Sequence, residues 1–82
     1  MSKQEISDIV TQTIAQAAAM DPAEVKADSD LIADLNMDSL AVFELVVDLE
    51  TAFDLQISDE DVETLHTPMQ IINYIAARVK LD

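Results

Sequence analysis

Apolar residues recur at intervals of three or four through most of the 82-residue chain, which is the spacing of one face of an α-helix. Helix-capping signals divide this pattern into four segments, and none alternates as a half-buried strand does. The four predicted helices cover about residues 2–19, 39–53, 59–65 and 67 onward. We therefore predict an all-α domain spanning residues 1–82, with a short third helix and a long loop at residues 23–37.

Side-chain caps mark the starts of the predicted helices. Ser2 and Glu5 have the spacing of a capping box at the first start, and Thr67 and Gln70 repeat it at the fourth. Asp38 can cap the second helix, because an aspartate before an apolar periodic run accepts hydrogen bonds from the first free amides. The chain contains no glycine, so asparagine, aspartate and proline residues must make its turns.

The long loop between the first two helices carries apolar residues of its own. Its length is at the upper end of what compact domains use, so it needs contacts that hold it in place. We expect four apolar side chains to anchor it to the core: Val25, Leu31, Ile32 and Leu35.

The charge of the chain is strongly negative. Seventeen acidic residues face four basic ones, for a net charge of −13, and residues 28–63 hold twelve acids and no base. Phosphates would be repelled, so nucleic acids and anionic membranes are disfavoured as partners, whereas basic protein surfaces are favoured. No apolar run reaches membrane-spanning length and no targeting signal is present, so we expect a cytoplasmic protein. Without cysteine, neither a disulfide nor a thiolate metal site can form.

The predicted second helix has two apolar faces, although a helix packed on one side needs only one. The face expected in the core comprises Val42, Leu45, Val46, Leu49, Ala52 and Phe53. The opposite face carries what we call the outer stripe, which comprises Leu40, Phe43 and Val47. Acids flank the outer stripe at Glu44, Asp48 and Glu50. This pattern favours a docking surface for a partner with a basic rim and an apolar centre; the alternative is that the long loop or the third helix covers the stripe.

Ser39 follows Asp38 at the predicted start of the second helix. Amide groups point outward at a helix start and the helix dipole favours negative charge there, so this is a suitable place for a phosphate. Ser39 lacks the partners of a catalytic nucleophile, because the only histidine, His66, comes without an oxyanion motif or a glycine-rich elbow. We therefore interpret Ser39 as a site of covalent attachment for a phosphate-linked group, and we expect no catalysis by the chain itself.

A metal site is the other chemistry that so many acids suggest. Asp28, Asp30 and Asp34 have the spacing of the start of a calcium loop, but Ala33 and Ser39 stand where such a loop requires glycine and glutamate. No group of residues has the spacing of a zinc or iron site. We therefore predict no specific metal site.

Several segments together resemble the acyl carrier protein family. They are Asp38-Ser39-Leu40, Glu44-Leu45-Val46, Leu49-Glu50 with Phe53, Leu31-Ile32-Ala33-Asp34-Leu35, Ile57-Ser58-Asp59-Glu60-Asp61 and Ile72-Asn73-Tyr74-Ile75. Motif, length, acidity and helix order agree over nearly the whole chain, whereas Asp-Ser-Leu alone would carry little weight.

The resemblance implies a four-helix bundle that carries its cargo on a prosthetic arm. A phosphopantetheinyl transferase would move 4′-phosphopantetheine from coenzyme A to Ser39, with Asp38 presenting the serine. The thiol of the arm would carry acyl groups as thioesters between enzymes of fatty-acid, polyketide or related lipid biosynthesis. Those enzymes would dock through basic patches onto the outer stripe and its acids. The implied acyl pocket between the helices comprises Ile32, Val42, Val46, Leu49, Val62 and Leu65.

Four positions depart from the pattern of the family. Asn36 replaces a usual glycine, and Ala41 replaces an acid that many fatty-acid carriers have. Phe43 is bulkier than the usual aliphatic residue, and Ser58 replaces a common proline. These departures indicate a specialised carrier, and the capping box directly after Met1 suggests a free-standing, monomeric one. Two alternatives stay open: an aminoacyl or peptidyl carrier, including a D-alanyl carrier, and an unmodified acidic interaction module. The dense acid of the second helix counts against the first.

Overall fold

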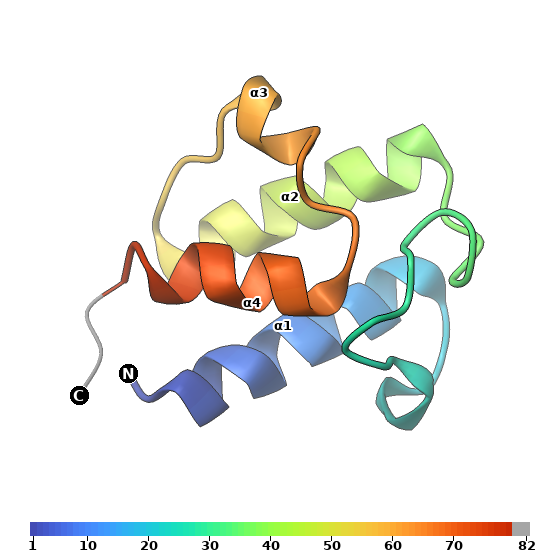
Figure 1. Ribbon diagram of the computed structural model, residues 1–82, viewed down its shortest axis with the longest axis horizontal. Coiled ribbons are helices and arrows are strands. Elements are labelled where there is room, and N and C mark those ends of the chain that lie inside the picture. The colour runs from blue at the N-terminus through green and yellow to red at the C-terminus, as the bar shows by residue number, and fades with distance from the viewer. Residues whose placement is uncertain (80–82) are drawn as a thin grey trace.

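The computed structural model describes residues 1–79, and all the regular secondary structure in that range is helical, which confirms the predicted fold class. The elements are α1 (Lys3–Ala18), a single 3₁₀ turn η1 (Pro22–Glu24), α2 (Ser39–Phe53), α3 (Asp59–Val62) and α4 (Pro68–Ala76). Helix α1 packs against α2 and α4, and α3 takes no part in these main helix pairs but lies above α2 (Figure 1). The result is a bundle of three longer helices with one short helix at its margin.

The core lies where the apolar faces of α1, α2 and α4 meet. Its most deeply buried large side chains are Ile6, Val10 and Ile14 of α1, Leu45 and Leu49 of α2, and Ile71 and Ile75 of α4. Burial of one such side chain contributes about 1.5–3 kcal/mol of transfer free energy. The predicted core face of α2 is largely correct, but Ala52 is exposed because it lies at the margin of the buried arc, near the C-terminal end of the helix.

The helices begin as their caps predict. The capping boxes of Ser2 with Glu5 and of Thr67 with Gln70 are both complete. At the start of α2, Asp38 accepts a 2.8 Å hydrogen bond from the Ala41 amide. Helix α3 is shorter than the sequence predicts, because its backbone turns after Val62 and thereby brings Leu65 into the core.

Within residues 1–79, three residues other than glycine have the left-handed backbone conformation that glycine usually adopts in turns. They are Ala19 (φ 56°), Asn36 (φ 60°) and Asp54 (φ 52°). An asparagine at position 36 therefore preserves the turn expected of the usual glycine.

The long loop is held by both apolar and backbone contacts. Leu31, Leu35 and Met37 are buried in the core, and the Leu31 amide donates a 2.9 Å hydrogen bond to the His66 carbonyl. The prediction that Ile32 anchors the loop is wrong, since 56% of its side chain is exposed. Val25 is half-buried against the core, and Met37, which the sequence analysis did not single out, is the additional anchor.

Candidate functional site

The first turn of α2 presents Ser39 at the surface. The backbone of Asp38 is extended (φ −93°, ψ 178°). Its side chain accepts a hydrogen bond from the Ala41 amide, and its carbonyl accepts one from the Val42 amide at 3.0 Å. Ser39 is the first helical residue and is exposed. Within residues 1–79 its hydroxyl has no hydrogen-bond partner, so no general base is in contact with it. The serine is therefore open to an outside reagent.

Ser39 lies at the edge of a cavity of about 360 Å³ between α2, the long loop and the segment that runs from α3 to α4. Its lining residues are Asp30, Leu31, Ile32, Ser39, Val42, Phe43, Val62, Glu63, Leu65 and His66. The side chains in its wall are predominantly apolar, which suits a hydrocarbon rather than a polar ligand. We call this space the Ser39 cavity.

Four residues of the predicted acyl pocket line the Ser39 cavity: Ile32, Val42, Val62 and Leu65. The other two, Val46 and Leu49, do not line it. They are 8% and 0% exposed and belong to the packed core, about one and two turns beyond Val42 along the helix. Helical periodicity predicts that Val42, Val46 and Leu49 all lie on the inner face of α2, but only the tertiary structure separates the cavity wall from the filled core.

Besides Ser39, the polar side chains of the cavity wall are Asp30, Glu63 and His66, and sequence reasoning did not assign these three residues to the cavity. The amides of Ala33 and Ile32 donate to the Asp30 carboxylate at 2.8 and 2.9 Å, and they hold its pKa below the usual value, with a smaller contribution from the charge of His66. Asp34 accepts from the Asp30 amide at 2.8 Å. Asp30 and Asp34 therefore fold the loop, which accounts for their spacing without a metal.

The outer stripe is exposed along α2. Leu40, Phe43 and Val47 are 66%, 60% and 43% exposed, so neither the long loop nor α3 covers them. Glu44 and Asp48 are exposed beside them. The stripe thus exposes contiguous apolar surface to water, which is unfavourable for the free protein and is typical of an interaction surface.

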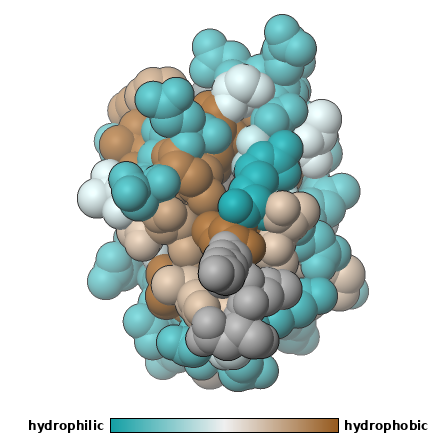
Figure 2. Space-filling model, turned by 90° about the vertical axis from the view of Figure 1, so that its left-hand side faces the viewer, coloured by the Kyte–Doolittle hydropathy of each residue, from teal (hydrophilic) through white to brown (hydrophobic). Residues whose placement is uncertain are grey.

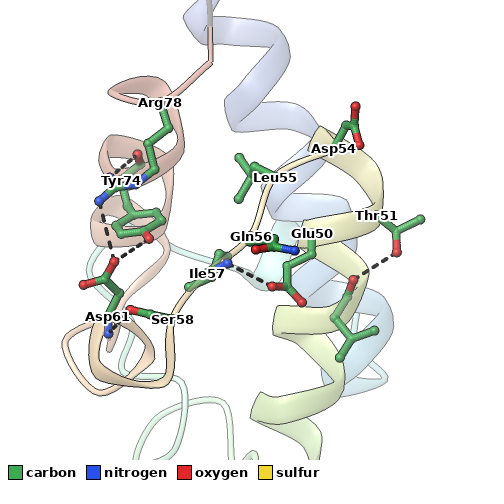
Figure 3. Close-up of a pocket in the computed structure, with 11 residues that line it drawn as sticks. Glu50, Thr51, Asp54, Leu55, Gln56, Ile57, Ser58, Asp61, Tyr74 and Arg78 are labelled. Atoms are coloured by element: carbon green, nitrogen blue, oxygen red, sulfur yellow. Dashed lines mark hydrogen bonds and ion pairs between the residues drawn. The ribbon is translucent and has the colours of Figure 1, made fainter.

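Glu50 is hydrogen-bonded to the loop that precedes α3. Its carboxylate accepts a 2.9 Å hydrogen bond from the Ile57 amide and so ties the end of α2 to the loop before α3 (Figure 3). The residue is half-buried. Its structural role therefore differs from that of the two exposed acids predicted with it.

A second, wider groove of about 760 Å³ lies at the C-terminal end of α2. Glu50 and Asp54 border it on the α2 side, and Asp61, Tyr74 and Arg78 border it on the other (Figure 3). The end of the molecule that carries the α2–α3 loop shows hydrophobic surface interrupted by hydrophilic residues (Figure 2). The side chains of Asp61, Tyr74 and Arg78 contact one another, and Glu50 accepts from the Ile57 amide, so these polar groups of the groove have structural roles.

No helix within residues 1–79 is long and apolar enough to cross a membrane. The same residues contain no cluster of three or more side chains that could hold a metal ion.

Residues 8–75 match the family model described as the phosphopantetheine attachment site. The chain belongs to the acyl carrier protein family. It is 38% identical to an acyl carrier protein of an Exiguobacterium species over 96% of this chain and 100% of that protein. It is 41% identical to the acyl carrier protein of Bdellovibrio bacteriovorus over 93% and 92% of the two chains.

A solved structure supports the same assignment. The acyl carrier protein from Enterococcus faecalis, in a structure described for its high thermal stability, superposes with a TM-score of 0.81 at 32% identity and covers 96% of this chain and 100% of its own. This chain therefore functions as an acyl carrier with phosphopantetheine as its prosthetic group. Acyl carrier proteins are carriers rather than catalysts, and they work with transferases and acyl-processing enzymes.

Proposed function

We propose that Ser39 is the residue to which a phosphopantetheinyl transferase attaches 4′-phosphopantetheine from coenzyme A. The observation that carries the proposal is the exposed, unpartnered hydroxyl at the first residue of α2, on the edge of an apolar cavity. The serine oxygen would bond to the phosphorus next to pantetheine as the phosphoanhydride of coenzyme A breaks, adenosine 3′,5′-bisphosphate would leave, and the serine proton would pass to a base of the transferase. Asp38 supports the geometry, because its cap holds the helix start that receives the phosphodiester.

The cargo would shelter in the Ser39 cavity as an acyl thioester. Ile32, Val42, Val62 and Leu65 offer it an apolar wall. Val46 and Leu49 lie beyond that wall in the filled core, so a chain that reached them would have to displace packed side chains. We therefore assign the first four residues to the pocket and the last two to its potential extension.

Partner enzymes would dock on the outer stripe. Leu40, Phe43 and Val47 supply its apolar centre, and Glu44 and Asp48 supply exposed negative charge for a basic rim. Glu50 would contribute at the far end of this surface, through the carboxylate oxygen that does not accept from Ile57.

The proposed setting is a monomeric carrier in the cytoplasm that serves fatty-acid, polyketide or related lipid biosynthesis and has no catalytic activity of its own. The alternative that keeps phosphopantetheine on Ser39 is an aminoacyl or peptidyl carrier, D-alanyl carriers included. The apolar wall of the Ser39 cavity favours acyl cargo. Loading by acyl-adenylating and by aminoacyl-adenylating enzymes, compared on the same holo protein, separates the two.

Intact mass spectrometry after incubation with coenzyme A and a promiscuous phosphopantetheinyl transferase tests the attachment. We expect one added phosphopantetheine on the wild type and on Ser7→Ala, a control serine in α1, and none on Ser39→Ala. A folded wild type that gains no mass, or a Ser39→Ala variant that still gains it, would contradict the proposal. The first result would favour the unmodified acidic interaction module.

A further inference from the structure

The polar part of the Ser39 cavity wall has hydrogen-bonding atoms that the protein does not use. The Ile32 and Ala33 amides both donate to Oδ1 of Asp30, so Oδ2 has no hydrogen-bond partner among residues 1–79. The ring of His66 makes no hydrogen bond within the described part of the chain either. An acceptor and a donor that are unused in an otherwise apolar wall favour a ligand with a polar group of its own.

Asp30 and His66, which we call the polar pair, come from two segments that are joined beside them. The Leu31 amide donates a 2.9 Å hydrogen bond to the His66 carbonyl, and the Met69 amide donates a 3.0 Å hydrogen bond to the Ala27 carbonyl. The amides that donate to Asp30 lower its pKa, and so, to a smaller extent, does the charge of His66. The two side chains of the polar pair are therefore held near each other.

The polar pair lies on the open side of the cavity. Leu31 and Leu65, which precede or follow the pair in sequence, are 2% and 7% exposed, whereas Asp30 is half-buried and His66 is exposed. Ser39, at the edge of the cavity, is exposed as well. The part of the cargo nearest the arm would therefore meet the polar pair, while the hydrocarbon tail covers the apolar floor.

We propose that the polar pair selects acyl groups that carry a hydroxyl on the second or third carbon. This inference rests on the proposed function of Ser39 and the cavity. The Asp30 carboxylate only accepts hydrogen bonds, and the His66 imidazole donates at least one in either protonation state. A hydroxyl matches both because it donates and accepts, whereas an oxo group only accepts and an ammonium group only donates. Glu63 adds a further exposed carboxylate to the same wall.

The test compares mirror-image cargo. A phosphopantetheinyl transferase loads the protein from the coenzyme A thioesters of the two enantiomers of 2-hydroxyoctanoate and of 3-hydroxyoctanoate. The rate of thioester cleavage by hydroxylamine, relative to that of the same free coenzyme A thioester, gives a protection factor. Enantiomers have equal apolar area, so the ratio of their protection factors reports the placement of the hydroxyl. For the wild type we expect a ratio of about threefold to tenfold in at least one enantiomeric pair.

Two variants remove the polar pair one group at a time. Asp30→Asn keeps Oδ1 for the two backbone amides and replaces the free Oδ2 acceptor by a donor, so the loop keeps its hydrogen bonds. His66→Leu removes the donor. We expect each variant to bring the enantiomer ratio to within about 1.5-fold of one. Glu60→Gln, which changes an exposed acid of α3 outside the cavity, should keep the wild-type ratio.

Nuclear magnetic resonance of His66 locates the contact. His66 is the only histidine of the chain, so its ring protons give one set of signals. We expect these signals to differ between octanoyl cargo and the preferred hydroxyoctanoyl enantiomer. Signals that move when the arm is attached to Ser39, but do not respond to the hydroxyl, would show that the polar pair binds the arm instead and would overturn the selection.

The outcomes separate this inference from the function on which it rests. If intact mass shows no acyl-phosphopantetheine on Ser39, the proposed function fails and the selection with it. If loading is normal but both enantiomer ratios of the wild type are close to one, the selection alone is overturned. A wild-type ratio that persists in both Asp30→Asn and His66→Leu overturns it as well. Far-UV circular dichroism checks that the variants are folded, and if Asp30→Asn is not, the exposed His66 still decides the result through His66→Leu.

Discussion

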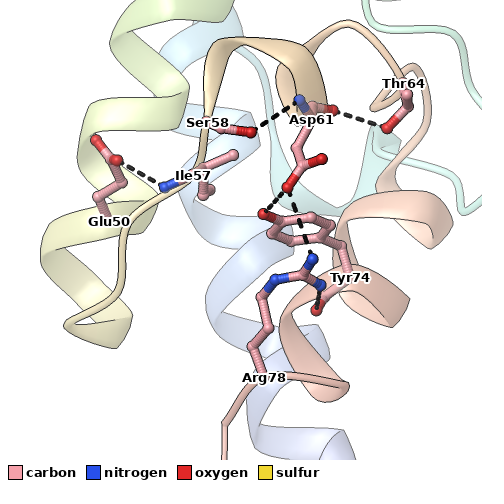
Figure 4. A network of polar contacts seen from close by, with 7 residues as sticks. All are labelled: Glu50, Ile57, Ser58, Asp61, Thr64, Tyr74 and Arg78. Carbon is pink, nitrogen blue, oxygen red and sulfur yellow. Dashed lines mark hydrogen bonds and ion pairs between the residues drawn. The ribbon is translucent and has the colours of Figure 1, made fainter.

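The phenol of Tyr74 on α4 donates a 2.6 Å hydrogen bond to the carboxylate of Asp61 on α3. The Arg78 guanidinium lies 3.4 Å from the centroid of the Tyr74 ring and 3.6 Å from the same carboxylate (Figure 4). Helix α3 has no buried residue and takes no part in the main helix packing. These polar contacts, which we call the Asp61 clasp, therefore help to hold α3 against α4, on an element that also contributes Val62 to the Ser39 cavity.

Loss of the Asp61 clasp should destabilise α3 first. Asp61→Asn removes the charged acceptor, and we expect it to lower the free energy of unfolding by about 1–2 kcal/mol. Asp59→Asn, a neighbouring acid of α3 whose side chain takes no part in the clasp, should change it by at most about 0.5 kcal/mol. Denaturant unfolding measures both values. Native-state hydrogen exchange should show faster opening of the α3 amides in Asp61→Asn alone; equal exchange in the two variants would contradict the clasp.

The clasp also predicts an alkaline transition. Burial, followed by the hydrogen bond to Asp61, raises the pKa of Tyr74 above its ordinary value of 10.0. The neutral phenol is thus favoured in the folded state, so its contribution to stability is complete below pH 10 and is lost as the pH rises through the raised pKa. Unfolding measured between neutral and strongly alkaline pH should show this loss in the wild type. Tyr74→Phe should be less stable at neutral pH and should lack that part of the alkaline slope.

The sequence predicted α2 well and α3 poorly, for one physical reason. Asp38 and the apolar run that ends at Phe53 act locally, so their consequences can be read from neighbouring residues. The length of α3 depends instead on how Leu65 reaches the core, which is a tertiary constraint. The exposure of Ile32 has the same origin, because periodicity shows that a residue is apolar but not whether its site is filled.

The features of the candidate site also divide into local ones, which the sequence predicts, and tertiary ones, which it does not. Ser39 and its cap were predictable, since a helix start is a local feature. The two apolar faces of one helix favoured an exposed outer stripe, but only the structure excludes that the long loop or α3 covers it. The hydrogen bond from the Ile57 amide to Glu50 spans seven positions through a non-helical loop and left no sequence signal. That Phe43 lines the Ser39 cavity could not be predicted from the sequence, because the cavity depends on where the long loop and α3 lie.

Glycine should stabilise the end of α1. Ala19 is left-handed, which costs a residue with a Cβ about 1–2 kcal/mol, part of it offset by the greater freedom of glycine in the unfolded chain. We expect Ala19→Gly to raise the free energy of unfolding by about 0.5–1 kcal/mol. Ala17→Gly, the same substitution inside α1, should lower it by about 1 kcal/mol. A loss of stability in Ala19→Gly would contradict this account of the helix end.

Added salt should stabilise the whole domain. Residues 28–63 hold twelve acids and no base, so their mutual repulsion opposes the compact state until counterions screen it. If screening recovers about 1 kcal/mol, the melting temperature of a domain this small rises by about 4–8 °C. Melting in sodium chloride and in magnesium chloride measures the effect. A melting temperature that neither salt changes would show that the acids are too widely spaced to destabilise the fold.

Tandem mass spectrometry of the loaded protein tests the central claim most directly. The chain has five serines, Ser2, Ser7, Ser29, Ser39 and Ser58, and fragmentation of the protein after treatment with coenzyme A and a phosphopantetheinyl transferase shows which one carries the added mass. We predict that every loaded molecule carries phosphopantetheine on Ser39 and on no other residue. Attachment at any other serine would contradict the account, because it would separate the arm from the start of α2 and from the cavity beside it.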